Sequence, residues 1–351
     1  MIEVEAPARI CFFGDHQDYL GLPVIAGTID RKINLIAIPN KKSKYVIHLL
    51  DLNKEITIDL HEKLNEIQSE DYYRSGLWVL QQKGAEFSQG YDIEISGTIP
   101  VNAGVSSSSA LVVAWLRFLN QAQVQPQNVS NEQIGKWAYE AEVEYFNQSG
   151  GIMDQYTIAQ GGLIFIDTQT EISTRLQPYL GTLIVAESGI SKQTQTVLQY
   201  ARAYGQKAIE AIQAQHPQFT IQEAIEADYK RYANCVPDLY ADHWYAAIHN
   251  YVLTLKAKKM LQGASVDIKQ LGTWMNEHQQ ILEERIQNTP AVMQKQMAAA
   301  RSEGALGAKI IGSGGGGCMV ALVPPSKKER VIEAFLNNGA QAAYEVKLYS
   351  F

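Results

Sequence analysis

The sequence predicts an α+β protein with two domains. Strand-like segments dominate the first hundred residues, and a mostly helical stretch runs from about 192 to 303. Strands and helices do not alternate regularly, which argues against a doubly wound parallel sheet. The 351 residues are more than twice the ~150 residues typical of one domain. We therefore expect one domain over 1–170 and a second over 171–351.

The individual elements follow from the spacing of apolar residues. Strands are expected where β-branched residues gather or alternate with polar ones: ARICFF (8–13), KINLIAIP (32–39), KYVIHLL (44–50), EITIDL (55–60), YDIEIS (91–96), LIFID (163–167), TLIVAES (182–188) and QAAYEVKLY (341–349). Helices are expected, besides the long stretch, over 71–83, 107–121, 131–146, a short segment after Gly151, and 326–338.

Composition and charge exclude several classes of protein. Hydrophobic residues make up 46% of the chain and charged residues 19%, which is unlike disordered, collagen-like or coiled-coil chains. The formal net charge of −7 argues against a broad surface for nucleic acid or anionic membranes. Cys11, Cys235 and Cys318 have neither a disulfide-framework nor a zinc spacing. With no signal-peptide pattern and no apolar run long enough to span a membrane, we expect a soluble cytoplasmic protein.

The segment PVNAGVSSSSALVVAWLRFL (100–119) predicts an anion site. A Pro–Gly–Ser loop leads into a helix that is apolar all round and so should be buried. The first amides of a helix have no partners within it, and its dipole places partial positive charge there. Gly104 lets a phosphate approach the backbone, and the serines from Ser106 to Ser109 offer hydroxyls. A serine-capped buried helix without a ligand remains the alternative.

A second glycine-rich loop lies in KIIGSGGGGCMVALV (309–323). It formally matches G-x-G-x-x-G, but a strand-like segment follows where a dinucleotide site needs a helix. We interpret it as two strands joined by a loop whose bare backbone presses against a ligand or another loop. A plain hairpin tip is the alternative. The chain has no G-x-x-x-x-G-K-[ST] motif, so it is not a P-loop protein.

Polar residues crowd the segment ARICFFGDHQDYLGLPV (8–24). Arg9, Asp15, His16 and Asp18 stand in an otherwise apolar strand and its turn. Such groups are suited to binding several hydroxyls of a polyol. A mononuclear metal site and a structural turn are the alternatives.

A third polar group lies in KWAYEAEVEYFNQSGGIMDQYTIAQGG (136–162). A helix there carries Glu140, Glu142 and Glu144, and periodicity alone does not decide which of them points into a site. Asp154 follows two glycines at the head of a short helix. It could be a general base or an acidic residue favoured in a first helical turn.

Together these motifs resemble those of the GHMP kinases, a family that includes galactokinase, homoserine kinase and mevalonate kinase. ARICFFGDHQDYLG is similar to the galactokinase signature GRxNxIGEHxDYxGG, PVNAGVSSSSA to the family's phosphate loop PxxxGLxSSxA, SGGIMDQ to CGIMDQ, and KIIGSGGGGC to the third family motif. ESGISKQTQTVL (187–198) and MNEHQQIL (275–282) look like further shared segments. The resemblance implies a ribosomal-protein-S5-like N-terminal α/β domain and a ferredoxin-like C-terminal α+β domain.

The resemblance also implies ATP- and Mg²⁺-dependent phosphoryl transfer to a small-molecule hydroxyl, most simply the anomeric hydroxyl of a sugar. It makes Asp154 the base and Arg9 the group that stabilises developing charge and keeps Asp154 ionised. The other implied roles are sugar binding by Asp15, His16, Asp18 and Gly151, ATP binding by Gly104, Ser106, Ser107, Ser108, Ser109, Gly314 and Gly315, and Mg²⁺ binding by Ser108 and Glu142.

Departures from the signature leave the acceptor open. Asp15 stands where galactokinases have Glu and is one methylene shorter, so the resemblance does not carry over the hydrogen bond to the C6 hydroxyl of the sugar. The galactokinase-type arginine-rich helix is missing from the C-terminal half. A uronic acid, a pentose, a heptose phosphate or mevalonate are therefore alternative acceptors, although mevalonate kinases have lysine where Arg9 stands. A non-catalytic sensor of ATP and sugar, and a decarboxylase of the same fold, are the alternatives from other classes.

Overall fold

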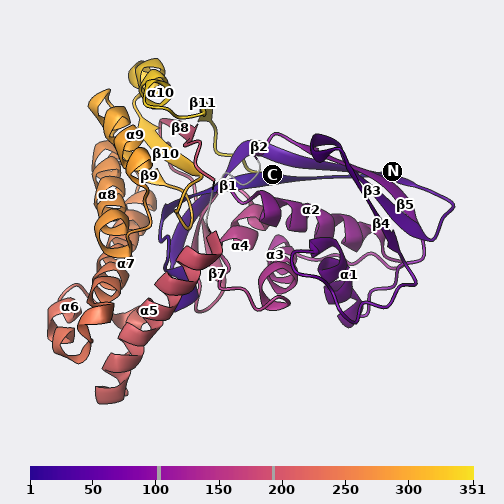
Figure 1. The fold of residues 1–351 in the computed structure, drawn as a ribbon, viewed down its shortest axis with the longest axis horizontal. Coiled ribbons are helices and arrows are strands. Elements are labelled where there is room, and N and C mark those ends of the chain that lie inside the picture. Colours follow the sequence, from indigo (N-terminus) through magenta and orange to yellow (C-terminus); the bar gives the residue numbers. More distant parts are fainter. Residues whose placement is uncertain (101–103, 192–193) are drawn as a thin grey trace.

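The computed structural model describes residues 1–100, 104–191 and 194–351. Residues 101–103 of the expected phosphate loop, and residues 192–193 within the shared segment 187–198, lie outside the described residues. The described chain forms two β-sheets, each with its own helices, arranged end to end in an elongated molecule (Figure 1). This is the two-domain α+β architecture that the sequence predicts.

The first sheet has seven strands in the described chain. They are β1 (Ile2–Phe13), β2 (Val24–Pro39), β3 (Lys44–Leu49), β4 (Lys54–Asp59), β5 (Tyr91–Gly97), β6 (Leu163–Asp167) and β7 (Ile172–Leu176). The order is β4-β3-β5-β2-β6-β7, with β1 paired to β2, and all pairs are antiparallel except β3 with β5. β1 and β2 are long, and they extend from the far end of this domain to the second sheet (Figure 1). The end of β1 is thereby placed between the two domains.

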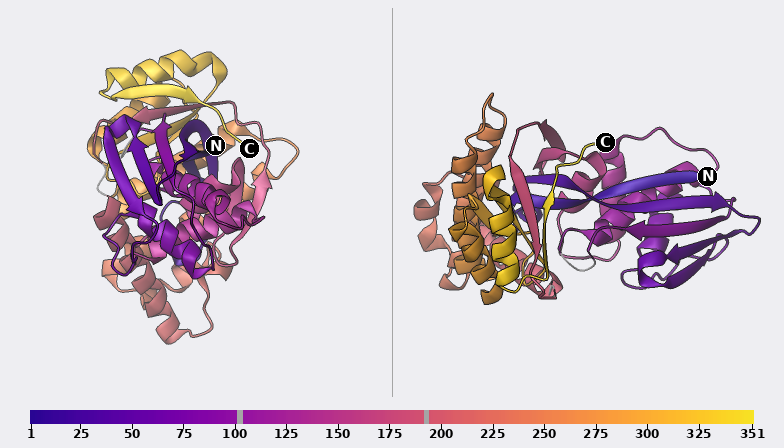
Figure 2. Two further views of the ribbon diagram at one scale, coloured as in Figure 1. Left: turned by 90° about the vertical axis from the view of Figure 1, so that its right-hand side faces the viewer. Right: turned by 90° about the horizontal axis from the view of Figure 1, so that it is seen from above.

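Helices cover one face of the first sheet (Figures 1 and 2). They are α1 (Tyr72–Gln82), α2 (Ser107–Ala122), α3 (Asn131–Tyr139) and α4 (Met153–Gln160), with a π-helical turn, η3 (Glu140–Glu144), directly after α3. α2 lies at the centre of this layer, with Trp115, Leu116 and Phe118 fully buried. The all-round apolar pattern of 107–121 therefore predicted its burial correctly.

The second sheet has four antiparallel strands in the order β11-β8-β10-β9. They are β8 (Thr182–Glu187), β9 (Gly307–Ile310), β10 (Cys318–Val323) and β11 (Ala342–Val346). The helices of this part are α5 (Thr194–Gln215), α6 (Asp228–Arg231), α7 (Ala241–Leu261), α8 (Ile268–Ile281), α9 (Ala291–Ser302) and α10 (Lys328–Asn337). The glycine-rich loop connects β9 to β10, as the strand–loop–strand interpretation predicts.

The hydrophobic core continues from one domain into the other. Successive side chains of a strand point to opposite faces of its sheet. On β8, Ile184 packs with Met297 of α9 and Phe335 of α10 in one cluster. The neighbouring Val185 belongs instead to the large cluster that contains Phe12 of β1. The second sheet thus packs against α9 and α10 on one face, and on the other against the first domain together with residues of α7 and α8.

The change from the first sheet to the second falls between β7 and β8. The last residues of the chain then return to the first sheet, where Leu348 forms a bridge with Ile29. A domain boundary between residues 170 and 171 stays a proposal. No helix among the described residues has both the length and the apolar character that crossing a membrane requires.

Candidate active site

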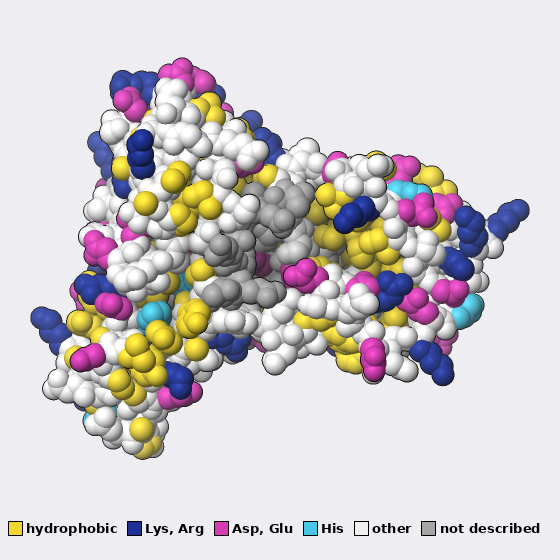
Figure 3. Space-filling model, in the orientation of Figure 1, with side chains coloured by type: hydrophobic (Ala, Val, Ile, Leu, Met, Phe, Trp, Pro, Cys, Tyr) yellow, Lys and Arg dark blue, Asp and Glu magenta, His cyan; other side chains and the backbone are white. Residues whose placement is uncertain are grey.

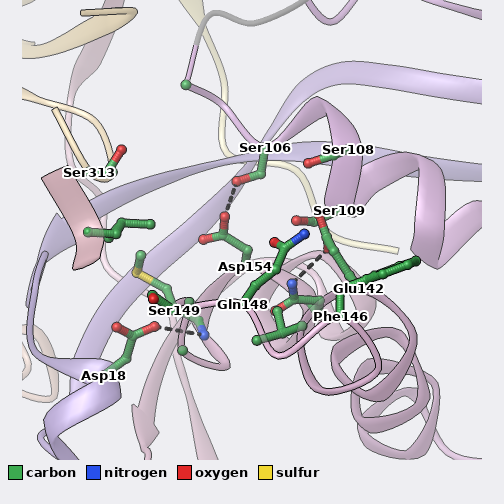
Figure 4. Close-up of a pocket in the computed structure, with 18 of the residues that line it drawn as sticks. Asp18, Ser106, Ser108, Ser109, Glu142, Phe146, Gln148, Ser149, Asp154 and Ser313 are labelled. Carbon is green, nitrogen blue, oxygen red and sulfur yellow. Dashed lines mark hydrogen bonds between the residues drawn. The ribbon is translucent and has the colours of Figure 1, made fainter. Parts of the chain in front are cut away.

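A cavity of about 610 Å³ lies between the two domains. This volume is in the range of pockets that bind small molecules. Its walls come from both halves of the chain: the end of β1 and the turn after it, the N-terminus of α2, η3 with the loop after it, α4, α5, and the glycine-rich loop. Figure 4 shows side chains from several of these elements pointing toward one another across it. The separate motifs of the sequence thus meet in one place.

Arg9 and Asp154 form a bidentate ion pair in this cavity. Arg9 donates from Nε to Asp154 Oδ1 at 2.6 Å and from Nη2 to Asp154 Oδ2 at 2.9 Å. Arg9 is buried, whereas the side chain of Asp154 is 28% exposed. Burial disfavours the charged guanidinium, but the charge of Asp154 and its hydrogen bonds outweigh burial and raise the pKa of Arg9. The carboxylate is therefore held in a fixed orientation at the cavity surface.

The phosphate-loop serines surround this pair. Ser106 is the residue before α2, with a left-handed backbone (φ 59°). Its hydroxyl donates to Asp154 Oδ2 and makes no capping bond to α2 (Figure 4). The guanidinium of Arg9 also donates to Gly104 O at 3.0 Å. The first amides of α2 thus lack the usual serine cap, which leaves donors for an anion at the cavity wall.

Asp18 and Gly151 are in direct contact. Asp18 Oδ2 accepts from the backbone N–H of Met153 at 3.3 Å (Figure 4). A Cβ atom on Gly151 would lie 2.2 Å from the carboxyl carbon of Asp18. Burial raises the pKa of Asp18 to about 6, and the nearby charge of Asp154 adds to this. Two carboxylates, of Asp18 and Asp154, therefore share one part of the cavity.

Glu142 lies in η3 and is buried. Its Oε2 accepts from Gln155 Nε2 at 2.7 Å (Figure 4), and hydroxyls of Ser108 and Ser109 also bond it. Burial raises the pKa of Glu142, while these hydrogen bonds oppose the rise. Of its neighbours, Glu144 is exposed and Glu140 pairs with Lys83. The structure thus directs the middle glutamate, which periodicity did not single out, into the cavity.

Asp15 and His16 are placed beside the glycine-rich loop. Asp15 is fully buried, accepting from Lys309 Nζ at 2.6 Å and from the Gly312 amide at 2.8 Å. His16 Nε2 lies 3.0 Å from Ser313 O, and its Nδ1 lies 2.8 Å from the Tyr19 hydroxyl. The role in substrate binding that the sequence predicts for both residues stays a prediction.

The glycine-rich loop is held mainly through its backbone. Gly314 and Gly315 have positive φ angles of 75° and 71°, which favour glycine. The Gly315 amide donates to Asn288 O at 2.6 Å, and a Cβ on Gly314 would lie 2.5 Å from the same oxygen. Gly312 and Ser313 line the cavity. The loop is therefore pressed against its neighbours, as its glycines predict.

Sequence reasoning missed several residues that shape the site. Asn288 binds Ser313 of the glycine-rich loop and Lys309 binds Asp15, while Glu70, Tyr72 and Gln148 line the cavity. The signal for Lys309 was a single charge in a strand that should be buried. The other four carry no local pattern, because distant segments bring them to the cavity.

The oxygen donors near Glu142 suit a hard divalent cation. One carboxylate and the hydroxyls of Ser108 and Ser109 lie together, and Mg²⁺ in kinases is held by one or two carboxylates with the phosphates of the substrate. Ser108 is exposed at the cavity wall. Among the residues that the structure describes, no group of three or more His, Cys, Asp or Glu is arranged to hold a metal by itself.

Two family profiles match the chain. The GHMP kinases N terminal domain matches residues 71–162, and the GHMP kinases C terminal domain matches residues 261–341. The chain belongs to the GHMP kinase family. It is an ATP-dependent kinase whose phosphate acceptor carries a hydroxyl group.

Curated relatives of this GHMP kinase include two different activities. Mevalonate kinase of Thermococcus onnurineus is 27% identical over 337 residues, covering 92% of this chain and 90% of the relative. Galactokinase of Pyrococcus furiosus is 26% identical over 344 residues, covering 95% and 92%. Sequence identity alone therefore does not separate the two acceptors.

Solved structures share the fold of this GHMP kinase. Lactococcus lactis galactokinase, solved with galactose, superposes with a TM-score of 0.88 at 20% identity, covering 99% of this chain and 93% of the other. Methanococcus jannaschii mevalonate kinase superposes with a TM-score of 0.74 at 18% identity, covering 99% and 98%. The two-domain arrangement is thus shared with both of these kinases.

Proposed function

We propose that this kinase transfers the γ-phosphoryl group of ATP to the anomeric hydroxyl of a neutral sugar. The observation that carries the proposal is the Arg9–Asp154 pair beside the uncapped N-terminus of α2. It joins a fixed carboxylate to a set of anion-binding donors. The choice of a sugar as acceptor rests on the signature of Arg9, His16 and Asp18, and the anomeric hydroxyl is inferred from the galactokinase relatives.

The residues present account for each part of the transfer. Asp154 accepts the proton of the acceptor hydroxyl. At the same time, the oxygen of that hydroxyl forms a bond to the γ-phosphorus. The bond from that phosphorus to the β,γ-bridging oxygen breaks, and its electron pair leaves with ADP. Arg9 and the first amides of α2 neutralise negative charge on the phosphoryl oxygens. Positioning and charge neutralisation are the main needs of this reaction.

The charge of the cavity favours a neutral acceptor. Among the described lining residues, Arg9 is the single Lys or Arg, and it is paired with Asp154. Carboxyl groups outnumber it: Asp18, Glu70, Glu142 and Asp154 line the cavity, besides Asp15, which is paired with Lys309. A carboxylate or phosphate on the acceptor would meet like charge there, which disfavours binding. This supports a sugar over uronic acids, sugar phosphates and mevalonate.

Glu142 and Ser108 are proposed to hold Mg²⁺ together with the ATP phosphates. Their oxygens are hard donors of the kind that Mg²⁺ takes, and burial makes the charge of Glu142 costly unless a cation is near. When bound, the ion would offset charge on the β- and γ-phosphates. Ser106, Ser107, Ser109, Gly104, Gly314 and Gly315 are proposed to contact ATP.

Mevalonate is the second candidate acceptor, because a mevalonate kinase is as similar in sequence as the galactokinases. The test is ADP release from Mg-ATP across a panel of neutral hexoses and pentoses, uronic acids, sugar phosphates and mevalonate. We expect turnover on a neutral sugar and none on the anions. Omission of Mg²⁺ should abolish turnover.

Asp154→Asn is the matched variant for this assay. It removes the base and keeps the shape of the side chain, so turnover should fall by at least about a thousandfold. Binding of a non-hydrolysable ATP analogue, measured by calorimetry, should change by less than about threefold. Robust turnover on mevalonate alone would refute the neutral-sugar proposal, and full activity of Asp154→Asn would refute the role of Asp154.

A further inference from the structure

Asp15 and His16 bind the backbone of the glycine-rich loop. Asp15 Oδ1 accepts from the Gly312 amide at 2.8 Å, and the imidazole of His16 lies 3.0 Å from the next carbonyl, Ser313 O. Asn288 supports the same point, since its Nδ2 lies within 3.1 Å of Ser313 O. Two adjacent side chains from the turn after β1 therefore grip two adjacent residues of a loop nearly 300 positions further along the chain.

Lys309, on β9 just before the loop, completes this junction. Its ammonium group is fully buried and donates to Asp15 Oδ2 at 2.6 Å, to Cys11 O at 3.2 Å and to Ile310 O at 2.6 Å. These three bonds satisfy all three of its protons. Both oxygens of Asp15 are likewise engaged, and its side chain has no exposed surface. An acceptor hydroxyl could reach this carboxylate only after the pair separates.

A neutral imidazole, that of His278, lies beside the pair. Burial lowers the pKa of His278 on α8 to about 3, and the charge of Lys309 adds to this. The neutral imidazole accepts from the Gly14 amide at 3.3 Å. For Asp15, burial alone would raise its pKa, but the charge and hydrogen bond of Lys309, together with its other polar neighbours, lower it. The two charges are thus matched to each other, and removing either leaves the other buried and unpaired.

We propose that Asp15 and Lys309 form a positioning pair that fixes the glycine-rich loop relative to Arg9, and that Asp15 does not bind the acceptor. This inference rests on the proposed function, in which the loop contacts ATP. Arg9 and Asp15 belong to one continuous stretch of β1 and its turn, so holding Gly312 to Asp15 sets the distance between the loop and the catalytic pair. The acceptor is then gripped by Asp18, whose carboxyl lies against Gly151.

The test compares Asp15→Asn, Lys309→Met and the double variant with Asp18→Asn. Loss of the pair should displace the glycine-rich loop, so each single variant should raise the KM for ATP by about tenfold and lower kcat by about tenfold or more. The KM for the acceptor should stay within about twofold. Asp18→Asn should do the reverse, raising the KM for the acceptor while leaving the KM for ATP nearly unchanged.

The double variant measures coupling. Asp15→Asn with Lys309→Met leaves no unpaired buried charge, so its melting temperature should recover above that of either single variant. Its KM for ATP should remain raised, because the bond network to the loop is still weakened. A pair with only a structural role would instead recover both its melting temperature and its KM for ATP in the double variant.

Two outcomes would overturn the proposal. One is an Asp15→Asn protein whose KM for the acceptor rises as in Asp18→Asn, with the KM for ATP unchanged, since Asp15 would then bind the acceptor. The other is unchanged affinity for a non-hydrolysable ATP analogue in every folded variant. That binding assay needs no acceptor, so failure of the wild-type protein to phosphorylate any sugar would count against the proposed function and not against the positioning pair.

Discussion

The carboxyl group of Asp18 is ionised at neutral pH in a place that disfavours its charge. Its pKa is raised from 3.8 to about 6, first by burial and then by the charge of Asp154, against the N–H groups of Met153 and Tyr19. A folded-state pKa above the unfolded one means that the ionised group destabilises the fold above pH 6, and that this cost disappears as the pH falls below about 4. Function near neutral pH thus opposes stability at this residue.

Asp18→Asn should therefore raise the free energy of unfolding at pH 7.5 by about 1–3 kcal/mol. The gain should shrink as the pH is lowered from 6 toward 4, which urea denaturation at several pH values would measure. Glu94→Gln, on the exposed surface of β5, is the control and should change stability by less than about 0.5 kcal/mol. An Asp18→Asn protein with a lower free energy of unfolding would show that the charge of Asp18 does not destabilise the fold.

The turn between η3 and α4 shows how an element serves the site through its backbone. Gly150 and Gly151 adjoin in sequence but differ in their surroundings. A Cβ on Gly151 would lie 2.2 Å from the Asp18 carboxyl group, whereas a Cβ on Gly150 would come no closer than 3.7 Å, to a methyl group of Val143. The close approach of Asp18 to the head of α4 therefore requires glycine at 151 only.

Gly151→Ala should displace Asp18 from the head of α4. We expect the KM for the acceptor to rise by about tenfold or more, since the carboxyl group of Asp18 must move to make room for the methyl group. Gly150→Ala is the matched control and should leave the KM within about twofold. Steady-state kinetics with the preferred sugar would measure both. Equal effects of the two variants would show that the contact with Asp18 is not what requires the glycine.

Elements with strong local signals were predictable from the sequence. β6 matches the expected strand 163–167, and α2 matches the expected helix 107–121 to within one residue. The helix expected over 131–146 ends instead at Tyr139 and continues as the π-helical turn η3. Apolar periodicity does not distinguish these two forms over a single turn. β7 was missed because most of its residues are exposed and, in the described part of the chain, it pairs only with β6, at the sheet edge.

The site was predictable to the extent that its residues lie in motifs. The meeting of Arg9, Asp154 and Ser106 follows from the family resemblance, and the structure brings them together. The pairing of Asp15 with Lys309 spans 294 positions. No local pattern encodes such a contact, because it depends on how β1 and β9 are placed by the core that joins the domains.

At the scale of the whole molecule, the chain end ties the two domains together. After β11 the chain crosses to the first sheet, where Tyr349 N donates to Thr28 O at 2.8 Å and Gly162 N donates to Tyr349 O at 2.7 Å. The hydroxyl of Thr28 donates to Tyr349 O and accepts from Gly162 N. Together with the core that both domains share, these bonds favour one cooperative unit.

On the face drawn in Figure 3, acidic and basic side chains are intermingled at the outer ends of the molecule.

Thr28→Val should weaken this tie, because a valine of similar shape leaves the Tyr349 carbonyl with one partner fewer. We expect the free energy of unfolding to fall by about 1–3 kcal/mol, with Thr28→Ser as a control that keeps the hydroxyl and loses only a methyl group, worth about 1 kcal/mol. Urea denaturation followed by far-UV circular dichroism and by tryptophan fluorescence would measure both. The wild-type protein should show one coincident transition by the two probes. Two separate transitions in the wild-type protein would mean that the domains unfold independently, and a Thr28→Val protein as stable as Thr28→Ser would mean that the hydroxyl contributes nothing to the tie.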